Sequence, residues 1–260
     1  MRCQVLSSGS RGNATLVRAG ELSVLVDAGL PPRELRMRLA AAGLPHRGID
    51  HVLVTHGHLD HSRSAGSLAR RHGATVHCPP TLMRQRSVRR APQLAAVRVG
   101  APAELVGRGD DRVVYRATLL PHDCDPTLAY RVEHRDRVLA VVTDMGRHDD
   151  GVARWLRDCH VLVLEFNHDP GMLDAGPYSD ALKRRIRSGR GHLSNGEAAR
   201  MLAAAAGPGL HTVVLAHLSQ VNNTPELARA AARAALEERG RADVRVLVAS
   251  QSEVGESLRV

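Results

Sequence analysis

The sequence predicts an α/β (α+β) protein, built as a four-layer αββα sandwich of two mixed β-sheets flanked by helices. Strands with alternating or continuous apolar residues are expected in both halves of the chain. Helix-length amphipathic segments accompany these strands in each half, so each sheet has helices to cover its outer face. The 260 residues contain no low-complexity linker and no short-period repeat. We therefore expect one domain, residues 1–260, with a single large core.

The N-terminal part begins with three expected strands, at residues 2–6, 16–18 and 21–27. A turn of small residues, 7–13, separates the first two. This turn either presents backbone N–H groups to a phosphate or is a plain hairpin connection. Asp27 ends a strand shortly before Gly29. Its carboxylate either orients a ligand histidine or caps the helix predicted over residues 31–42.

The rest of the chain alternates between strands and helices. Further strands are expected at residues 49–54, 74–77, 112–119, 128–133, 137–143, 161–164, 212–216 and 244–248. Further helices are expected at residues 64–71, 80–90, 150–157, 173–188, 196–206 and 224–238. Strands followed by helices, twice over, predict two sheets that each pack against helices.

Residues 56–61 have the sequence His-Gly-His-Leu-Asp-His and directly follow the strand expected at 49–54. In extended backbone, side chains two residues apart point the same way, so His56 and His58 can bind one ion together. A turn after His58 would direct Asp60 and His61 towards a second ion. Imidazole nitrogen and carboxylate oxygen are suitable ligands for zinc, manganese or iron. The alternative is a polar strand-to-helix loop that contains histidines by chance.

Other expected strands also end close to a potential ligand, namely His122, Asp144, Glu165 or His217. A lone histidine at a strand end is more often a surface residue than a ligand. Here, however, separate strand ends each supply a His, Asp or Glu in addition to the loop at 56–61. Their convergence at one edge of the sandwich would form a dinuclear metal site.

The formal net charge is +9, and Lys183 is the only lysine in the sequence, so almost all basic residues are arginines. Because this bias suggests codon usage, local clusters are better evidence for a polyanionic partner than total charge. The clusters are Arg84, Arg86, Arg89 and Arg90, and Lys183, Arg184, Arg185, Arg187 and Arg190. The second cluster ends just before His192, which favours a nucleic-acid partner. A solvated face is the alternative for both clusters.

Cysteine usage and hydropathy indicate a cytoplasmic protein. The four cysteines are scattered and form no C-x-x-C pair, which argues against a disulfide framework and against a structural zinc knuckle. No apolar run approaches the roughly 18 residues of a membrane span, and the N-terminus lacks a signal-peptide pattern. We therefore expect no association with a membrane.

The motif His56-x-His58-x-Asp60-His61, followed by His122, Asp144 and His217, resembles the metallo-β-lactamase fold superfamily over nearly the whole chain. Four further motifs are similar to the YycJ/WalJ-type branch of that superfamily. They are Ser7-Ser8-Gly9-Ser10-x-Gly12-Asn13, Leu164-Glu165-x-Asn167-His168-Asp169, Gly191-His192-Leu193-Ser194-Asn195 and His217-Leu218-Ser219-x-x-Asn222-Asn223. This branch is linked to DNA 5′→3′ exonuclease activity and is related to RNA-processing phosphodiesterases.

The resemblance implies two divalent metal ions, Zn or Mn, and a role for each matching residue. The first ion would be held by His56, His58 and His122, the second by Asp60, His61 and His217, with Asp144 bridging. The catalytic candidates are Asp60, Glu165 and His192, where Glu165 orients His192 and His192 donates a proton to the leaving oxygen. Candidates for support behind the ligands are Asp27 and His168. Candidates for substrate binding are Ser8, Asn13, Lys183, Arg184, Arg187, Asn195 and Asn222.

Two of these roles have alternatives: His192 is otherwise a helix-capping loop residue, and His168 otherwise packs in a polar loop. The function implied is hydrolysis of a nucleic acid by water activated between the two ions. DNA is favoured over RNA because no β-CASP insertion separates Asp144 from His217. Rival functions are hydrolysis of a small thioester, lactone or cyclic phosphodiester, and non-catalytic nucleic-acid binding.

Overall fold

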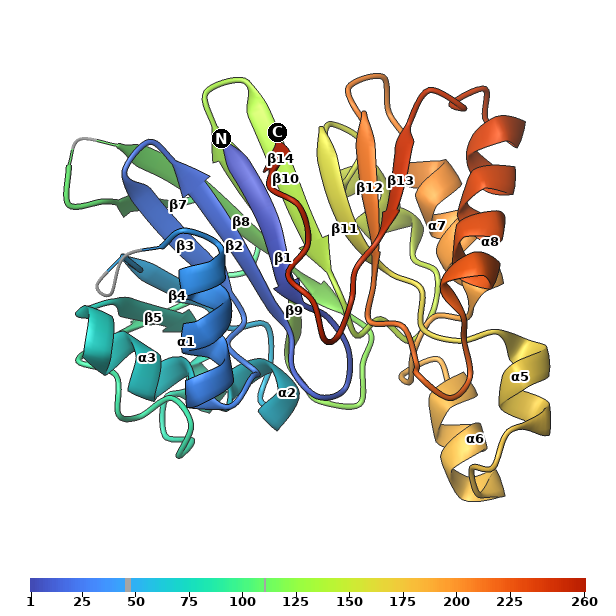
Figure 1. Ribbon diagram of the computed structural model, residues 1–260, viewed down its shortest axis with the longest axis horizontal. Helices are drawn as coiled ribbons and strands as arrows, with labels where there is room; N and C mark the ends of the chain where they lie inside the picture. The colour runs from blue at the N-terminus through green and yellow to red at the C-terminus, as the bar shows by residue number, and fades with distance from the viewer. Residues whose placement is uncertain (45–47, 110) are drawn as a thin grey trace. The chain divides into compact units, whose positions relative to one another are not determined.

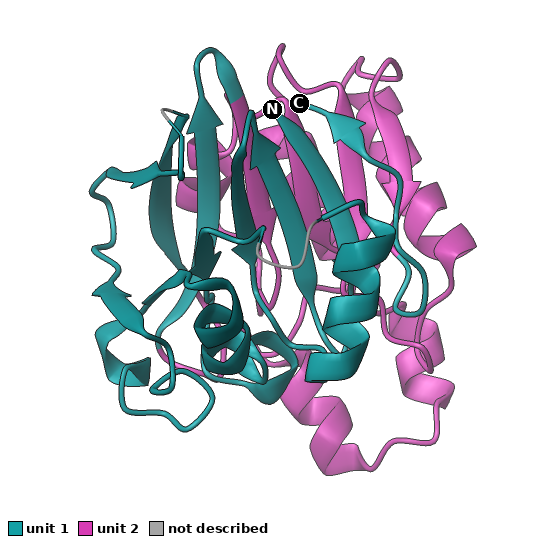
Figure 2. Cartoon of the chain, turned by 60° about the vertical axis from the view of Figure 1, so that its left-hand side comes forward, with its two compact units in different colours: residues 1–119, 126–137, 250–260 teal, residues 120–125, 138–249 magenta. Residues whose placement is uncertain are grey.

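The computed structural model describes residues 1–44, 48–109 and 111–260. These residues form two compact units, which Figure 2 shows in different colours. Unit 1 comprises Met1–Leu119, Pro126–Arg137 and Ser250–Val260, and unit 2 comprises Leu120–Asp125 and Val138–Ala249. Within the described ranges, no helix has both the length and the apolar composition of a membrane span.

Unit 1 contains a mixed seven-stranded sheet with the order β14-β1-β2-β3-β4-β5-β6. Its strands are β1 (Arg2–Ser7), β2 (Ala14–Ala19), β3 (Leu22–Val26), β4 (His51–Leu53), β5 (Thr75–Cys78), β6 (Gln93–Ala96) and β14 (Leu258–Arg259). Strand β1 pairs antiparallel with β14 and β2, and β2 pairs antiparallel with β3. From β3 to β6 the pairing is parallel. Parallel pairing makes β3 and β4 end at the same edge, where the candidate metal loop begins.

Two helices of unit 1, α1 (Pro32–Ala41) and α3 (Ala65–His72), supply apolar side chains to one core with the sheet. Figure 1 shows both in front of β3, β4 and β5. All five residues of β3 are buried, in agreement with a sequence that is apolar apart from Ser23. Leu35 and Leu39 of α1 and Leu68 and Ala69 of α3 complete the core around Val52. This packing fixes the strand ends on which the loop at 56–61 depends.

The second sheet has strands in both units. Unit 1 holds β7 (Ala103–Val106), nearly all of β8 (Arg112–Leu120), and β9 (Thr127–His134), and β7 pairs antiparallel with β8. Unit 2 holds β10 (Arg137–Val142) from Val138 onwards, β11 (Val161–Glu165), β12 (Thr212–Ala216) and β13 (Arg245–Val248). The strands from β10 to β13 are parallel neighbours in chain order. Their carboxyl ends therefore lie at one edge of the sheet.

The helices of unit 2 are α4 (Asp150–Trp155), α5 (Pro170–Ala175), α6 (Asp180–Arg187), α7 (Asn195–Ala205) and α8 (Pro225–Glu238). Figure 1 shows α7 and α8 side by side against the strands, while α5 and α6 extend beyond their carboxyl ends. Helix α7 begins with a complete capping box in which Ser194 and Glu197 bond reciprocally. Both β11 and β12 are entirely buried, as expected for central parallel strands.

The predicted fold class is confirmed, since two mixed sheets flanked by helices are present. The helix predicted at 80–90 is wrong, because only the 3-10 turn η1 (Pro80–Leu82) forms there. The carbonyl of Ser87 accepts a bond from the Gly66 amide instead of one within a helix. The helix predicted at 173–188 is two helices, α5 and α6, which Gly176 and Pro177 separate. Strands β6, β7 and β14 were not predicted, and the single-domain organisation stays a prediction.

Candidate metal centre

In unit 1, the four expected ligands of the loop at 56–61 lie close together. The Nε2 atom of His56 is 3.0 Å from Nδ1 of His58, and Nε2 of His61 is 3.5 Å from Oδ2 of Asp60. The rings of His56 and His61 have centroids 4.2 Å apart, and both side chains are buried. Helix α2 (Leu59–Ser62) provides the turn after His58 that the sequence predicts. The loop therefore gathers imidazole and carboxylate donors of the kind that divalent ions accept.

Asp27 supports this loop from behind. Its Oδ2 atom lies 2.6 Å from Nδ1 of His61, and Oδ1 accepts a hydrogen bond of 2.8 Å from the Thr55 amide. Burial raises the pKa of Asp27, whereas His61 and the bonds from Thr55 act in the opposite direction. Because Nδ1 of His61 faces this carboxylate, Nε2 is the ring nitrogen that a metal ion would take, in place of its present contact with Asn13. The helix-cap alternative for Asp27 is wrong, because the N-cap of α1 is Pro31 and no side chain caps it.

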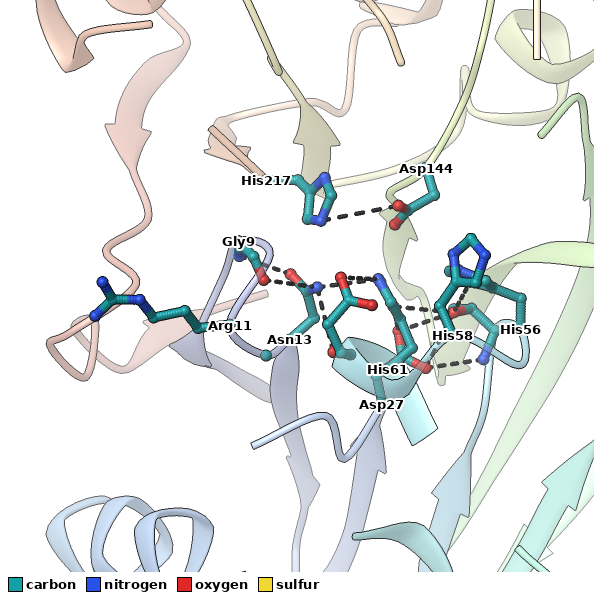
Figure 3. Close-up of polar contacts among 12 residues, drawn as sticks. Gly9, Arg11, Asn13, Asp27, His56, His58, His61, Asp144 and His217 are labelled. Atoms are coloured by element: carbon teal, nitrogen blue, oxygen red, sulfur yellow. Dashed lines mark hydrogen bonds and ion pairs between the residues drawn. The ribbon is translucent and has the colours of Figure 1, made fainter. Parts of the chain in front are cut away.

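The small-residue turn at 7–13 closes on itself and on the metal loop (Figure 3). Asn13 Oδ1 accepts from the Gly9 amide at 2.9 Å, and Asn13 Nδ2 lies 3.0 Å from Nε2 of His61. The Asn13 amide donates to the carbonyl of Asp60 at 2.7 Å. The amides of Ser8, Arg11 and Gly12 also donate within the protein. These bonds do not support the phosphate-nest alternative for the turn, which instead holds the loop in place.

In unit 2, four side chains converge at the strand ends. Donor atoms of Asp144, Glu165, His192 and His217 all lie within 4.8 Å of one another. Asp144 Oδ1 is 3.8 Å from Nε2 of His217 and 3.9 Å from Nε2 of His122. Figure 3 shows His217 and Asp144 facing each other. These separations are too long for hydrogen bonds, but they suit donor atoms that share an ion. The donor set therefore fits a divalent metal.

Three candidate site residues have a backbone conformation that only glycine adopts readily. The φ angles are 61° for Asp27, 64° for Asp144 and 55° for His217. Each of these residues directly follows the end of an apolar strand, or lies one residue beyond it. A left-handed residue costs free energy, and such strain is concentrated at functional sites. The geometry thus marks these positions independently of their side-chain chemistry.

Glu165 and His192 form a tightly bonded pair. Glu165 Oε1 lies 2.6 Å from Nδ1 of His192 and 3.3 Å from Nδ1 of His217, and Oε2 accepts from the Met145 amide at 2.7 Å. Burial favours a higher pKa for Glu165, but the charge of His192 and the bonds from both histidines lower it to about 2. Burial disfavours the charged form of His192, but Glu165 prevails and raises its pKa. The pair therefore holds a proton on a partly exposed imidazole.

The loop that carries His192 packs too closely for any residue but glycine. A Cβ atom on Gly191 would lie 2.1 Å from the Ile186 carbonyl oxygen, and one on Gly146 would lie 2.4 Å from Cα of Arg190. The Gly191 carbonyl in turn lies 2.9 Å from Nδ1 of His122. This contact leaves the Nε2 atom of His122 3.2 Å from Oδ1 of Asp123 and 3.9 Å from Oδ1 of Asp144. The glycines thus set the positions of two predicted site histidines.

The deciding comparison is with protein families, because residues 8–163 match the family model for the metallo-beta-lactamase superfamily. The chain belongs to the metallo-beta-lactamase superfamily. It is 34% identical to "Exodeoxyribonuclease YycJ" of Bacillus anthracis, over 91% of this chain and 89% of that protein. It is 29% identical to "Exodeoxyribonuclease WalJ" of Streptococcus pneumoniae, over 86% of this chain and 84% of that protein. The predicted superfamily and branch are confirmed.

Other superfamily members match less of the chain or only its fold. "Ribonuclease Z" of Mycobacterium sp. (strain KMS) is 33% identical over 51% of this chain and 55% of that protein. The crystal structure of YhfI from Bacillus subtilis has a TM-score of 0.75 at 17% identity, with 99% of this chain and 98% of that chain covered. The relatives are named as nucleases, so this superfamily member is a metal-dependent hydrolase. The non-catalytic alternative is set aside.

The polar residues proposed for substrate binding in this metallo-beta-lactamase fold are buried. Ser8, Asn13, Asn195 and Asn222 are 5%, 4%, 4% and 1% exposed. Asn195 and Asn223 exchange two side-chain hydrogen bonds of 2.9 Å. Contacts of this kind favour a structural role over direct contact with a substrate. His168 is similar, since its carbonyl accepts from the Asn195 amide and its ring is buried, which lowers its pKa.

The two basic clusters differ in how far their charges are paired. Lys183 donates to the Asp174 carbonyl at 2.7 Å, Arg187 forms an ion pair with Asp174, and Arg185 forms one of 2.5 Å with Asp123. These bonds join α6 to its surroundings. Among the described residues, the exposed side chain of Arg184 on α6 has no ion pair. Much of the predicted basic surface on α6 is therefore used within unit 2.

The cluster at 84–90 lies against the metal loop of unit 1. Gln85 Nε2 donates to the Gly57 carbonyl at 2.6 Å, and Ser87 Oγ lies 3.0 Å from Ser62 Oγ. Its four arginines, Arg84, Arg86, Arg89 and Arg90, are all exposed. These arginines were predicted candidates, but Gln85 was not, and its side-chain hydrogen bond to the Gly57 carbonyl places them. The only signal for Gln85 was its position among them.

Asn167 is a further positioning residue. It belongs to a motif of the predicted branch, but no role was predicted for it. Its Nδ2 atom donates to the His217 carbonyl at 2.9 Å and lies 3.5 Å from the His217 ring. This bond holds the left-handed backbone of His217. The motif Glu165-x-Asn167 was the available signal, since alternate residues beyond a strand share one face.

Proposed function

We propose that the protein is a dinuclear-metal-dependent phosphodiesterase that degrades DNA, with 5′→3′ exonuclease activity. Its similarity to exodeoxyribonucleases of two bacteria over most of each chain supports DNA as the substrate. The observation that best supports a proton-transfer site for hydrolysis is the 2.6 Å contact between Oε1 of Glu165 and Nδ1 of His192. The same nitrogen lies 3.8 Å from Oδ1 of Asp144. We also propose a cytoplasmic location, on the evidence of the reduced cysteines.

For the metal ligands, we propose the assignment that the superfamily implies. His56, His58 and His122 would hold one ion, Asp60, His61 and His217 the other, and Asp144 would bridge the two. A pair of bound divalent ions supplies a water of lowered pKa and offsets negative charge on a phosphate group. The donors accommodate zinc and manganese equally well. Asp27 and Thr55 hold His61 through Nδ1, in the orientation that this assignment needs.

His192 acts as the proton donor in this proposal. Glu165 holds Nδ1 of His192 and raises its pKa, which favours the protonated imidazole, and the Nε2 proton would pass to the leaving oxygen. His192 is 22% exposed and Glu165 is fully buried, so a substrate reaches the histidine and not the carboxylate. Glu165 thus positions the donor, as the third group of a catalytic triad does.

The test is digestion of end-labelled DNA by the metal-loaded protein and by His192→Ala. Since general acid catalysis typically contributes about 10²–10⁴-fold, turnover by His192→Ala should fall by that order while the metal content stays at the wild-type level. Label released first from the 5′ end would establish the polarity. Wild-type rates for His192→Ala would refute the role of His192.

RNA is the second candidate substrate, because relatives named ribonuclease Z match about half of the chain. End-labelled RNA of the same sequence, digested in parallel, separates the two. We expect kcat/KM for DNA to exceed that for RNA. A preference for RNA would keep the phosphodiesterase assignment and overturn the choice of DNA.

A further inference from the structure

Unit 2 contains a cavity of about 750 Å³ whose lining includes none of the candidate catalytic or metal-binding residues. It lies where α4, α7 and α8 meet, and alanines from all three helices contribute to its wall. Alanine side chains are small, so they leave space between helices that otherwise pack closely. The volume lies within the range of about 300–1,000 Å³ that small-molecule sites have.

Arginines from each of the three elements surround this cavity. Arg154 lies on α4, and Arg157 follows just after the C-cap residue of that helix and lines the same cavity. Arg200 lies on α7, and Arg239 is the C-cap residue of α8. All four side chains are exposed. The helices therefore bring guanidinium groups from distant parts of the sequence to one opening.

The carboxylates of the lining offset these four charges only in part: after the bond from His148, the charge of Arg154 also lowers the pKa of Asp150. In residues 1–44, 48–109 and 111–260, we find no ion pair and no side-chain hydrogen bond for any of the four arginines. The lining contains two carboxylates, Asp150 and Glu238, and Asp150 already bonds to His148 at 2.9 Å. A group of arginines that repel one another and have few local partners favours an anionic ligand.

We propose that this cavity binds a ligand that carries two or more phosphate groups. Guanidinium groups present planar, paired N–H donors that match phosphate oxygens, and several of them can share one polyphosphate. Among the described lining residues, His148 is the only one with a ring, so phosphate oxygens and not a stacked base are recognised. The phosphates belong either to a free polyphosphate compound or to the backbone of a nucleic-acid strand. The proposal does not depend on the proposed nuclease function.

The experiment is calorimetric titration with two probes, inorganic tripolyphosphate and a short single-stranded DNA without terminal phosphates. The test variant is Arg154→Gln/Arg200→Gln, and the matched control is Arg98→Gln/Arg233→Gln, which removes the same charge from exposed positions outside the cavity. Glutamine is a good helix former, so α4 and α7 should be retained, and melting temperature checks this. Hydrolysis of bis(p-nitrophenyl) phosphate, which is too small to need the cavity, reports on the catalytic site.

We expect the test variant to bind tripolyphosphate roughly 10- to 100-fold more weakly than the wild type, because two guanidinium groups that form charge-assisted hydrogen bonds are removed. The control should bind as the wild type does, and hydrolysis should be unchanged in all three proteins. Loss of DNA binding alone would identify the strand backbone as the source of the phosphates. Equal binding of both probes to the test variant and the control, or no saturable binding to the wild type, would overturn the proposal.

Discussion

At the scale of single residues, the ligands depend on polar neighbours that hold their rings. Asp27 and Thr55 hold His61, Glu165 holds His192, and Asn167 holds the backbone of His217. A histidine held at one ring nitrogen presents the other nitrogen in a defined direction. Less conformational entropy is therefore lost when the metal ion binds. The chemistry of the site is therefore distributed over more residues than its ligands.

The contact of Asp27 with His61 gives the first prediction at this scale. Asp27→Asn removes the carboxylate that holds Nδ1 of His61 while it preserves side-chain volume. Loss of such a partner typically costs about 10–100-fold in metal affinity, and we expect that loss here. Competition with a chromogenic chelator measures it.

The matched control for Asp27→Asn is Asp50→Asn. Asp50 accepts a bond from the Ser23 amide near the opposite end of β3 and contacts no candidate ligand. Its substitution should leave metal affinity unchanged. Wild-type affinity in Asp27→Asn would show that the orientation of His61 does not depend on this carboxylate.

At the scale of elements, the loop from α6 to α7 sets the position of His192. Gly191 has no room for a side chain, because a Cβ atom would lie within 2.3 Å of two carbonyl oxygens of α6. Gly191→Ala should therefore shift this loop, reduce DNA hydrolysis about tenfold or more and lower the free energy of unfolding by about 1–3 kcal/mol. Hydrolysis rates and urea denaturation test both effects.

Gly196→Ala is the control for this substitution. Gly196 lies in the first turn of α7, and a Cβ atom there would meet no heavy atom within 4 Å. We expect activity to be retained and stability to rise slightly, since alanine favours a helix more than glycine does. If the two substitutions behaved alike, close packing at Gly191 would not be the reason for its effect.

Strand β5 of the unit 1 sheet also makes stability depend on pH. His77 on β5 is buried beside His51, and burial followed by the charge of His51 lowers its pKa from 6.5 to about 4. The unfolded chain therefore takes up a proton that the folded protein resists, so stability is lost as pH falls from about 6.5 to about 4. We expect the free energy of unfolding to fall by about 2 kcal/mol between about pH 7.5 and pH 5.

Urea denaturation at these two pH values, on wild type and His77→Gln, measures this contribution. The variant lacks the titrating group, so its stability should change less over the same interval. An equal change in both proteins would assign the pH dependence to other groups.

At the scale of the whole molecule, what could be predicted was local in sequence. The order of the six residues 56–61 was enough to predict a metal-binding loop. The apolar composition of the strands was enough to predict that they are buried. The bond between Asp27 and His61 joins residues 34 positions apart, and the strand end at Asp27 predicted a carboxylate behind a ligand histidine but not which histidine. For the same reason, the pairing of Arg185 with Asp123 could not be predicted.

Other differences arise where tertiary contacts override a local pattern. The basic segment 80–90 has helix-forming residues, but its carbonyl at Ser87 bonds to Gly66 and its Gln85 side chain to Gly57. The break between α5 and α6 was visible as Gly176-Pro177 in the sequence, but the helical period on either side obscured it. Such contacts decide which of several allowed local structures is formed.

The central claim is that the proposed ligands hold two ions, with Asp144 as the bridging ligand. The most direct measurement is the number of divalent ions per chain, by mass spectrometry of the metal-saturated and desalted protein. We predict two ions for the wild type and fewer for Asp144→Ala, which should also lose DNA hydrolysis. Two ions retained by a folded Asp144→Ala protein would contradict the account.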